Sequence, residues 1–141
     1  MRTIEIADEA KLAGIVANIP KDTAIVMLNL LKFNDRADYP ENSGVEPCSG
    51  RDAYMKRYIV PAKPYLKEAG GENIYQSEVP ATVIGPEQEN WDAMLLFRYP
   101  SIDAFIQMVS TPHYQELRKH RKAALEDSRL IATIETPLYE A

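Results

Sequence analysis

The chain of 141 residues is poor in the features that mark several familiar classes of protein. It has one cysteine, Cys48, so no disulfide can form within the chain, which is typical of a reducing compartment. Its N-terminal residues lack the apolar core of a signal peptide. No apolar run approaches the roughly 20 residues that a membrane-spanning helix needs. We therefore expect a cytoplasmic protein without a membrane partner.

Positive charge is also scarce, with 16 Lys and Arg against 21 Asp and Glu and a formal net charge of -5. Nucleic-acid-binding surfaces need clustered Lys and Arg. The one basic cluster lies beside acidic residues and predicts a solvated helix face; its members are Arg118, Lys119, Arg121 and Lys122. We expect no nucleic-acid partner.

Metal and cofactor motifs are missing as well. His113 and His120 lie seven residues apart with Glu116 between them, which places them on one helix face, but this is not the H-E-x-x-H motif. No third ligand cluster completes a site. The chain has no Gly-rich phosphate loop, no nucleotide-binding fingerprint and no Ser-His-Asp candidate. The sequence therefore predicts neither a metal nor a cofactor.

What the chain does contain is an alternation of apolar strand patterns and amphipathic helix patterns. Pro61 and Pro64 predict a break or kink in the second helix near Ile59, so that two short helices are expected there and not one straight helix. Ser49, Ser101 and Thr111 are the expected helix caps, besides Asp8 for the first helix. Strands are expected over 24–33, 73–84, 91–99 and 129–136, and helices over 8–18, 50–69, 101–110 and 112–125.

Apart from the first helix, the order is strand, helix, strand, strand, helix, strand. This order predicts an α+β fold, a ferredoxin-like βαββαβ sandwich with an extra N-terminal helix. We expect a single domain over 1–141, with a helical extension at 1–20 and a long loop at 34–50 that is either a functional flap or disordered.

Two strands, 24–33 and 91–99, are apolar on both faces, although a single layer of helices covers only one face of a sheet. A second copy of the chain would cover the other face. The pattern therefore predicts a homodimer in which the two sheets pack against each other, as in a dimeric α+β barrel.

Five segments of the chain have a distinctive sequence: NLLKF at 29–33, SGRDAYMKRY at 49–58, RYPSIDAF at 98–105, PHY at 112–114 and RKAALEDSRL at 121–130. Through these segments the chain resembles the DUF1330 family, part of the dimeric α+β barrel superfamily, from about Ala24 to Glu135. The resemblance implies a ferredoxin-like protomer and a dimer, but no reaction. Relatives in the superfamily include small cofactor-independent monooxygenases, lactone isomerases and haem-handling enzymes, which is an analogy of fold only.

Asn29 interrupts the apolar strand 24–33. A buried amide needs hydrogen-bond partners, so Asn29 is either a ligand-orienting group in a cavity or a core amide bonded to a neighbouring strand or helix end. If the polar-bearing strand faces line a cavity, Arg98, Thr133 and Glu135 join Asn29 there. The alternative is that Arg98 and Glu135 lie at strand ends, where they meet solvent or pair.

Three further side chains are candidates. His113 follows Pro112 in a first helical turn, where the helix N-terminus favours a neutral imidazole suited to a general base; the alternative is a partly exposed histidine. Tyr58, with Tyr54 and Tyr65, lies on the helix that would roof a cavity, although aromatics at this spacing also serve as core. Trp91 is either a substrate contact or a packing anchor.

The favoured hypothesis is a small cofactor-independent enzyme, monooxygenase-like or isomerase-like by superfamily analogy. It would act on a small organic molecule in a pocket between sheet and helices. Asn29 and Arg98 would orient a polar or anionic substrate, His113 or Tyr58 would move a proton, and Trp91 and Glu135 would add contacts. Two alternatives stay open, a non-catalytic dimeric binding or stress-related module and a structural dimer without a pocket. The sequence does not decide whether the protein is an enzyme.

Overall fold

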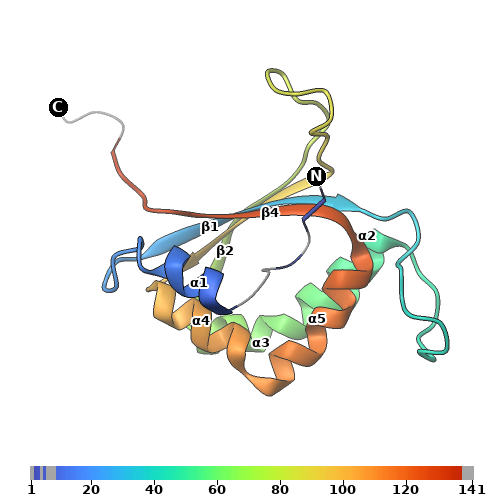
Figure 1. Ribbon diagram of the computed structural model, residues 1–141, viewed down its shortest axis with the longest axis horizontal. Coiled ribbons are helices and arrows are strands. Elements are labelled where there is room, and N and C mark those ends of the chain that lie inside the picture. Colours follow the sequence, from blue (N-terminus) through green and yellow to red (C-terminus); the bar gives the residue numbers. More distant parts are fainter. Residues whose placement is uncertain (1, 4, 6–8, 138–141) are drawn as a thin grey trace.

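The structure is a computed structural model and describes residues 2–3, 5 and 9–137. An antiparallel sheet in the order β2-β3-β1-β4 carries its helices on one face only (Figure 1). This is the predicted α+β ferredoxin-like fold, with the additional helix α1 (Glu9–Val16) before it. The expected cap Asp8 lies outside the described residues. The strands are β1 (Ile25–Phe33), β2 (Glu72–Glu78), β3 (Ala93–Tyr99) and β4 (Leu125–Thr133).

The two faces of the central strand β1 have different neighbours. Its alternate residues pack against the helices and are all buried; this inner face carries Ile25, Met27, Asn29, Leu31 and Phe33. The residues between them point to the opposite, outer face of the sheet, which has no helix over it (Figure 1). The outer face of β1 carries Val26, Leu28, Leu30 and Lys32.

The helical segment after the long loop begins at Ser49, whose hydroxyl accepts the N–H of Asp52 at 3.0 Å, as predicted. Near Ile59, where a break or kink is predicted, the structure has the boundary between two helical segments of different winding. The helix continues through this boundary, and the N–H of Val60 bonds the carbonyl of Met55 five residues back. Pro61 then falls in the first turn of the next segment, where its missing N–H costs little. The segments are α2 (Gly50–Asp52), the π-helical η1 (Ala53–Ile59) and α3 (Val60–Glu68).

Two more helices complete the inner layer, α4 (Ile102–Ser110) and α5 (Pro112–Ala124). Ser101 caps α4 as predicted, since its hydroxyl accepts the N–H of Ala104 at 3.1 Å. Thr111 does not cap α5 with its side chain; its hydroxyl instead donates to the carbonyl of Met108 at 2.9 Å and closes α4. No helix in the described part of the chain is long and apolar enough to span a membrane.

The loop over 34–49 lies against the C-terminal end of α5. The N–H of Asn34 donates to the carbonyl of Ala124 at 2.8 Å, and the N–H of Asp38 donates to that of Ala123 at 2.7 Å. The hydroxyl of Tyr39 and Nδ1 of His120 lie 2.6 Å apart. Backbone and side-chain bonds therefore fix this loop to one helix end.

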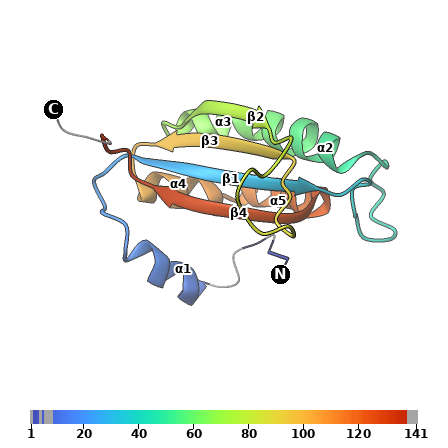
Figure 2. The ribbon, with the colours of Figure 1, turned by 90° about the horizontal axis from the view of Figure 1, so that it is seen from above.

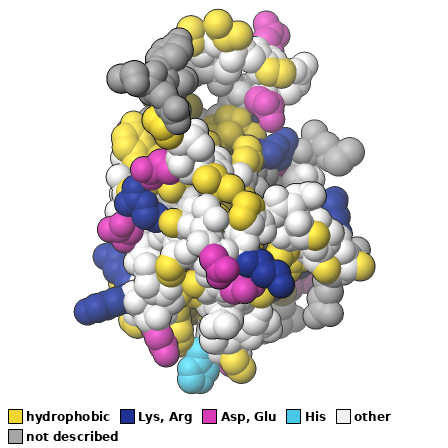
Figure 3. All heavy atoms as spheres, turned by 90° about the vertical axis from the view of Figure 1, so that its left-hand side faces the viewer, with side chains coloured by type: hydrophobic (Ala, Val, Ile, Leu, Met, Phe, Trp, Pro, Cys, Tyr) yellow, Lys and Arg dark blue, Asp and Glu magenta, His cyan; other side chains and the backbone are white. Residues whose placement is uncertain are grey.

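Residues 79–92, called the arm below, connect β2 to β3 and stand over the outer face of the sheet (Figures 1 and 2). The strand predicted to run to residue 84 stops at Glu78, because Pro80 has no N–H to donate to the ladder. Across the sheet, Arg129 of β4 pairs with Glu89 of the arm at 3.4 Å. Val83 and Ile84 are each 94% exposed, and Figure 3 shows hydrophobic side chains at the top of the arm.

Candidate functional site

A cavity of about 730 Å³ lies between the inner face of the sheet and the helices. Small-molecule sites in proteins commonly have volumes of roughly 300–1,000 Å³. All four strands form one wall, and η1, α3, α4 and α5 form the other. Helix α1 adds Leu12 and Ile15 to the lining, beside the edge of the sheet at β4 (Figure 2).

Asn29 lies in the middle of the sheet wall of this cavity and is only 8% exposed. Its ladder partners are Leu95 of β3 and Leu130 of β4, so its immediate neighbours on the inner face are apolar. Its side chain forms no hydrogen bond with any other described residue. No described side-chain nitrogen or oxygen is both sealed from solvent and unbonded. The Asn29 amide therefore opens into the cavity.

Tyrosine side chains line the helix wall opposite Asn29. The hydroxyls of Tyr58 and Tyr114 are hydrogen-bonded to each other, and the ring of Tyr54 lies 5.1 Å from that of Tyr58. Burial, together with the nearby Tyr58, raises the pKa of both Tyr54 and Tyr114 above the ordinary value for tyrosine. These phenols stay protonated at neutral pH and line the cavity.

Two arginines of α5 also line the cavity, Arg118 and Arg121. The expectation that the whole basic cluster is a solvated face is wrong for these two. They lie four and seven residues after Tyr114, on the face that α5 turns inward, whereas Lys119 and Lys122 are exposed. The guanidinium of Arg121 donates to the hydroxyl of Ser128 at 3.2 Å, and Ser128 is 4% exposed on β4.

Arg98 and Glu135 do not share the cavity with Asn29, so the predicted grouping is wrong. Arg98 is paired with Val26 in the ladder and Asn29 is three residues further along β1, which puts the two side chains on opposite faces of the sheet. On the outer face, Arg98 donates to Glu72 at 2.9 Å and to Glu135 at 2.7 Å. Arg98 and Glu135 therefore form an ion pair near the ends of their strands, which is the alternative prediction. Thr133 lies on the outer face too and donates to a β1 carbonyl.

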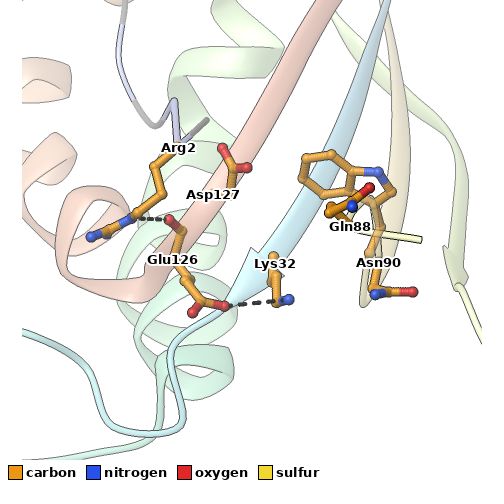
Figure 4. Close-up of a pocket in the computed structure, with 7 residues that line it drawn as sticks. Arg2, Lys32, Gln88, Asn90, Glu126 and Asp127 are labelled. Carbon is orange, nitrogen blue, oxygen red and sulfur yellow. Dashed lines mark hydrogen bonds and ion pairs between the residues drawn. The ribbon is translucent and has the colours of Figure 1, made fainter. Parts of the chain in front are cut away.

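Trp91 is also outside the cavity. The guanidinium of Arg129 lies 5.0 Å above its ring, and Trp91 is buried beside a separate hollow of about 170 Å³. Figure 4 shows this hollow, whose wall includes the pair between Lys32 and Glu126 at 3.6 Å. These contacts are those of a packing anchor.

His113 is exposed and does not line the cavity, which contradicts its predicted place beside the substrate. It is the second residue of α5, and the next residue, Tyr114, is the one that this turn directs inward. His120, the other histidine, is held by Tyr39. Among the described residues no group of three His, Cys, Asp or Glu side chains could hold a metal ion.

Residues 49–134 match the family model described as "Domain of unknown function (DUF1330)". The chain belongs to the DUF1330 family. This DUF1330 chain is 34% identical to RPA0582, a protein of unknown function from Rhodopseudomonas palustris, with a TM-score of 0.85 over 97% of this chain and 99% of that one. Comparison with curated proteins gives no match.

More distant structures share the fold of this DUF1330 chain. A hydroxynitrile lyase from Passiflora edulis is 11% identical, with a TM-score of 0.54 over 84% of this chain and 99% of that one. A dimeric protein of unknown function with a ferredoxin-like fold from Bacteroides fragilis is 12% identical, with a TM-score of 0.50 over 82% of this chain and 100% of that one. Likeness at these identities shows the fold alone.

Proposed function

We propose that this protein binds a small organic molecule in the cavity between sheet and helices, and that Asn29 orients it. The observation that carries the proposal is the buried Asn29 amide, which faces the cavity without a hydrogen bond to another described residue. An amide that opens into a cavity without a bond to the protein keeps its donor and acceptor available to a bound molecule. A ligand with a carbonyl, hydroxyl or similar group would supply the missing partner.

Catalysis is the first form of this function. The linked hydroxyls of Tyr58 and Tyr114 face the same cavity as Asn29, so a bound molecule could be held by the amide and exchange a proton with a phenol. The fold is compatible with such work, since it also occurs in a hydroxynitrile lyase. A cofactor-independent enzyme of this kind takes its acid from the tyrosine pair and not from His113.

Binding without turnover is the second form, in which the same cavity holds a molecule that leaves unchanged. The cavity wall is more apolar than polar, which suits storage or sensing of a small ligand as well as catalysis. Product analysis separates the two forms. Any compound that stabilises the protein is incubated with it, and chemical change is followed by mass spectrometry.

The test of the site compares thermal stabilisation by a compound library in the wild type, in Asn29→Leu and in Asn90→Leu. Asn90 is an exposed amide on the arm, so its variant makes the same chemical change outside the cavity. We expect hits that stabilise the wild type and Asn90→Leu but lose most of their effect in Asn29→Leu. Hits that stabilise all three proteins equally would remove Asn29 from the site.

A homodimer that forms through the outer face of the sheet is the assembly that we propose. The helices cover only the inner face (Figure 1), and the outer face leaves Tyr75 and Ile131 about half exposed. The middle of the outer face is apolar along the central strands β1 and β3. A second sheet packed on this face would bury that apolar surface. The dimeric ferredoxin-like protein from Bacteroides fragilis is a precedent for this fold in a dimer. In this assembly each protomer keeps its own cavity.

A further inference from the structure

The charges that line the cavity are opposite in sign to the charge of the chain. The formal net charge is -5, yet Glu5 is the only acidic side chain among the described residues that line the cavity. The basic residues that line it are Lys11, Lys63, Arg118, Arg121 and Arg129. A low-dielectric hollow with walls of one charge sign concentrates ligands of the opposite sign.

Arg129 is already engaged, because its guanidinium covers Trp91 and pairs with Asp127 and Glu89. The two arginines of α5, Arg118 and Arg121, lie on the helix wall of the cavity. Arg118 forms no ion pair or hydrogen bond with another described residue, and it lies three positions before Arg121 on the same helix face. Both reach the interior between sheet and helices, where water screens charge less than at the surface.

The position of Arg121 shows how far from Asn29 a negatively charged group would bind. Its guanidinium is anchored on the hydroxyl of Ser128, which is paired with Leu31, two residues along β1 from Asn29. Diagonal neighbours on one face of an antiparallel pair are about 7–8 Å apart. The charge of Arg121 also acts on the hydroxyl of Tyr54, opposing the burial that raises the pKa of this phenol. Guanidinium, amide and phenols therefore face one space.

We propose that the ligand of this cavity is an organic acid with an apolar body, whose anionic group binds Arg121 and Arg118. A guanidinium offers paired N–H donors that match a carboxylate, sulfonate or phosphate. The apolar body lies against the tyrosine wall, and a polar atom on it reaches the Asn29 amide. This inference rests on the proposed function, because it names the chemical class of the molecule that occupies the same cavity.

Two fluorescent probes with one skeleton test the charge preference. Anilinonaphthalene sulfonate is anionic, and N-phenylnaphthylamine is its neutral counterpart without the sulfonate. Their affinities are measured by fluorescence titration. We expect the wild type to bind the sulfonate at least about tenfold more tightly, because a charge-assisted hydrogen bond contributes more than a neutral one.

Three variants assign that preference to the arginines. Arg118→Gln and Arg121→Gln are each expected to weaken binding of the sulfonate about tenfold and to leave the neutral probe unchanged. Arg121→Lys keeps the charge and should keep most of the preference. Lys122→Gln is the matched control, since it removes one positive charge from an exposed position of the same helix.

Leu130→Trp separates failure of this inference from failure of the proposed function. Leu130 lies beside Asn29 on the cavity wall, so the larger side chain occupies the space where a ligand would sit. If both probes bind equally well in the wild type and both are blocked by Leu130→Trp, the cavity is a binding site but the inference of an acid is wrong. If neither probe binds, or Leu130→Trp blocks neither, the inference is overturned together with the proposed binding function.

Discussion

Asn29 is polar on a sheet face where its neighbours along and across the strands are apolar. Because its amide bonds no described residue, replacing it with leucine breaks no hydrogen bond among these residues and adds apolar contact. We expect the free energy of unfolding of Asn29→Leu to equal that of the wild type or to exceed it by about 1 kcal/mol. Urea denaturation followed by circular dichroism measures the difference.

Asn34→Leu is the matched control for that experiment. The amide of Asn34 does have a partner, since Nδ2 donates to the carbonyl of Ala123 at 3.0 Å. Its replacement should therefore lower the free energy of unfolding by about 1 kcal/mol. A similar loss in Asn29→Leu would mean that its amide is bonded within the protein, and the site argument would fail.

The hydroxyls of Tyr58 and Tyr114 depend on each other, since they bond one another inside the cavity wall. Tyr58→Phe leaves the Tyr114 hydroxyl without this bond, and we expect a loss of about 1–2 kcal/mol in the free energy of unfolding. The double variant Tyr58→Phe/Tyr114→Phe removes both hydroxyls and should lose no more than the single variant. A double-mutant cycle measured in urea gives the coupling; additive losses would show that the two hydroxyls do not interact.

The order of strands and helices was predictable, because each element carries its own periodic pattern and cap. Ser49 and Ser101 start their helices as expected, and the apolar strands 24–33 and 91–99 correspond to β1 and β3. The prolines indicated the division near Ile59, but the π winding before it was not predicted, because Pro61 and Pro64 mark where a helix is disturbed and not which hydrogen bonds replace the usual ones. Local sequence rules fix what each segment is more firmly than where it ends.

The candidate site was predictable only in part. Asn29 was found because one amide in an apolar strand breaks a pattern. Its supposed partner Arg98 was assigned to the wrong face, since face parity within each strand does not fix the register between strands. The acidic residues beside the basic cluster predict a solvated face for Arg118 and Arg121, although the spacing of these arginines from Tyr114 indicates an inward face.

The attachment of the long loop to α5 should depend on pH through His120. Burial lowers the pKa of His120, and the charges of Lys119 and Arg57 lower it further. Its pKa in the folded state is thus below the unfolded value of about 6.5, so protonation favours unfolding. The contribution of His120 to stability is fully present above about pH 6.5 and is lost as the pH falls from there toward the folded pKa.

Urea midpoints measured between about pH 5 and 8 test this dependence. We expect the midpoint of the wild type to fall below about pH 6.5 and that of His120→Gln to stay level. His113→Gln, at an exposed position, should keep the wild-type slope. The titration of Asp127 lies below this pH range. Burial alone would raise the pKa of its carboxyl, but hydrogen bonds from Thr3, Ser128 and Arg129 outweigh burial and lower that pKa. If the urea midpoint of His120→Gln still fell with pH, the dependence would not come from His120.

The whole molecule presents two sheet faces with separate roles in our proposals. The inner face holds the cavity, and the outer face is apolar in its middle but has only the arm above it (Figures 1 and 2). The arm ends in Val83 and Ile84, which are 94% exposed, although apolar side chains gain from burial. A second sheet on the outer face would lie within reach of this tip. The dimer would therefore explain the sheet and the arm together.

We expect the wild type to be a dimer at micromolar concentration by light scattering. Leu28→Glu puts a charge in the middle of the outer face and should give a folded monomer, because an unpaired charge cannot be buried between two sheets. Ile84→Asp should weaken the dimer about tenfold, which corresponds to roughly 1.4 kcal/mol. Val60→Asp makes the same kind of change at a half-exposed apolar residue on the helix side and should leave the dimer intact. A monomeric wild type, or a Leu28→Glu variant that stays dimeric, would show that the outer face is not the interface.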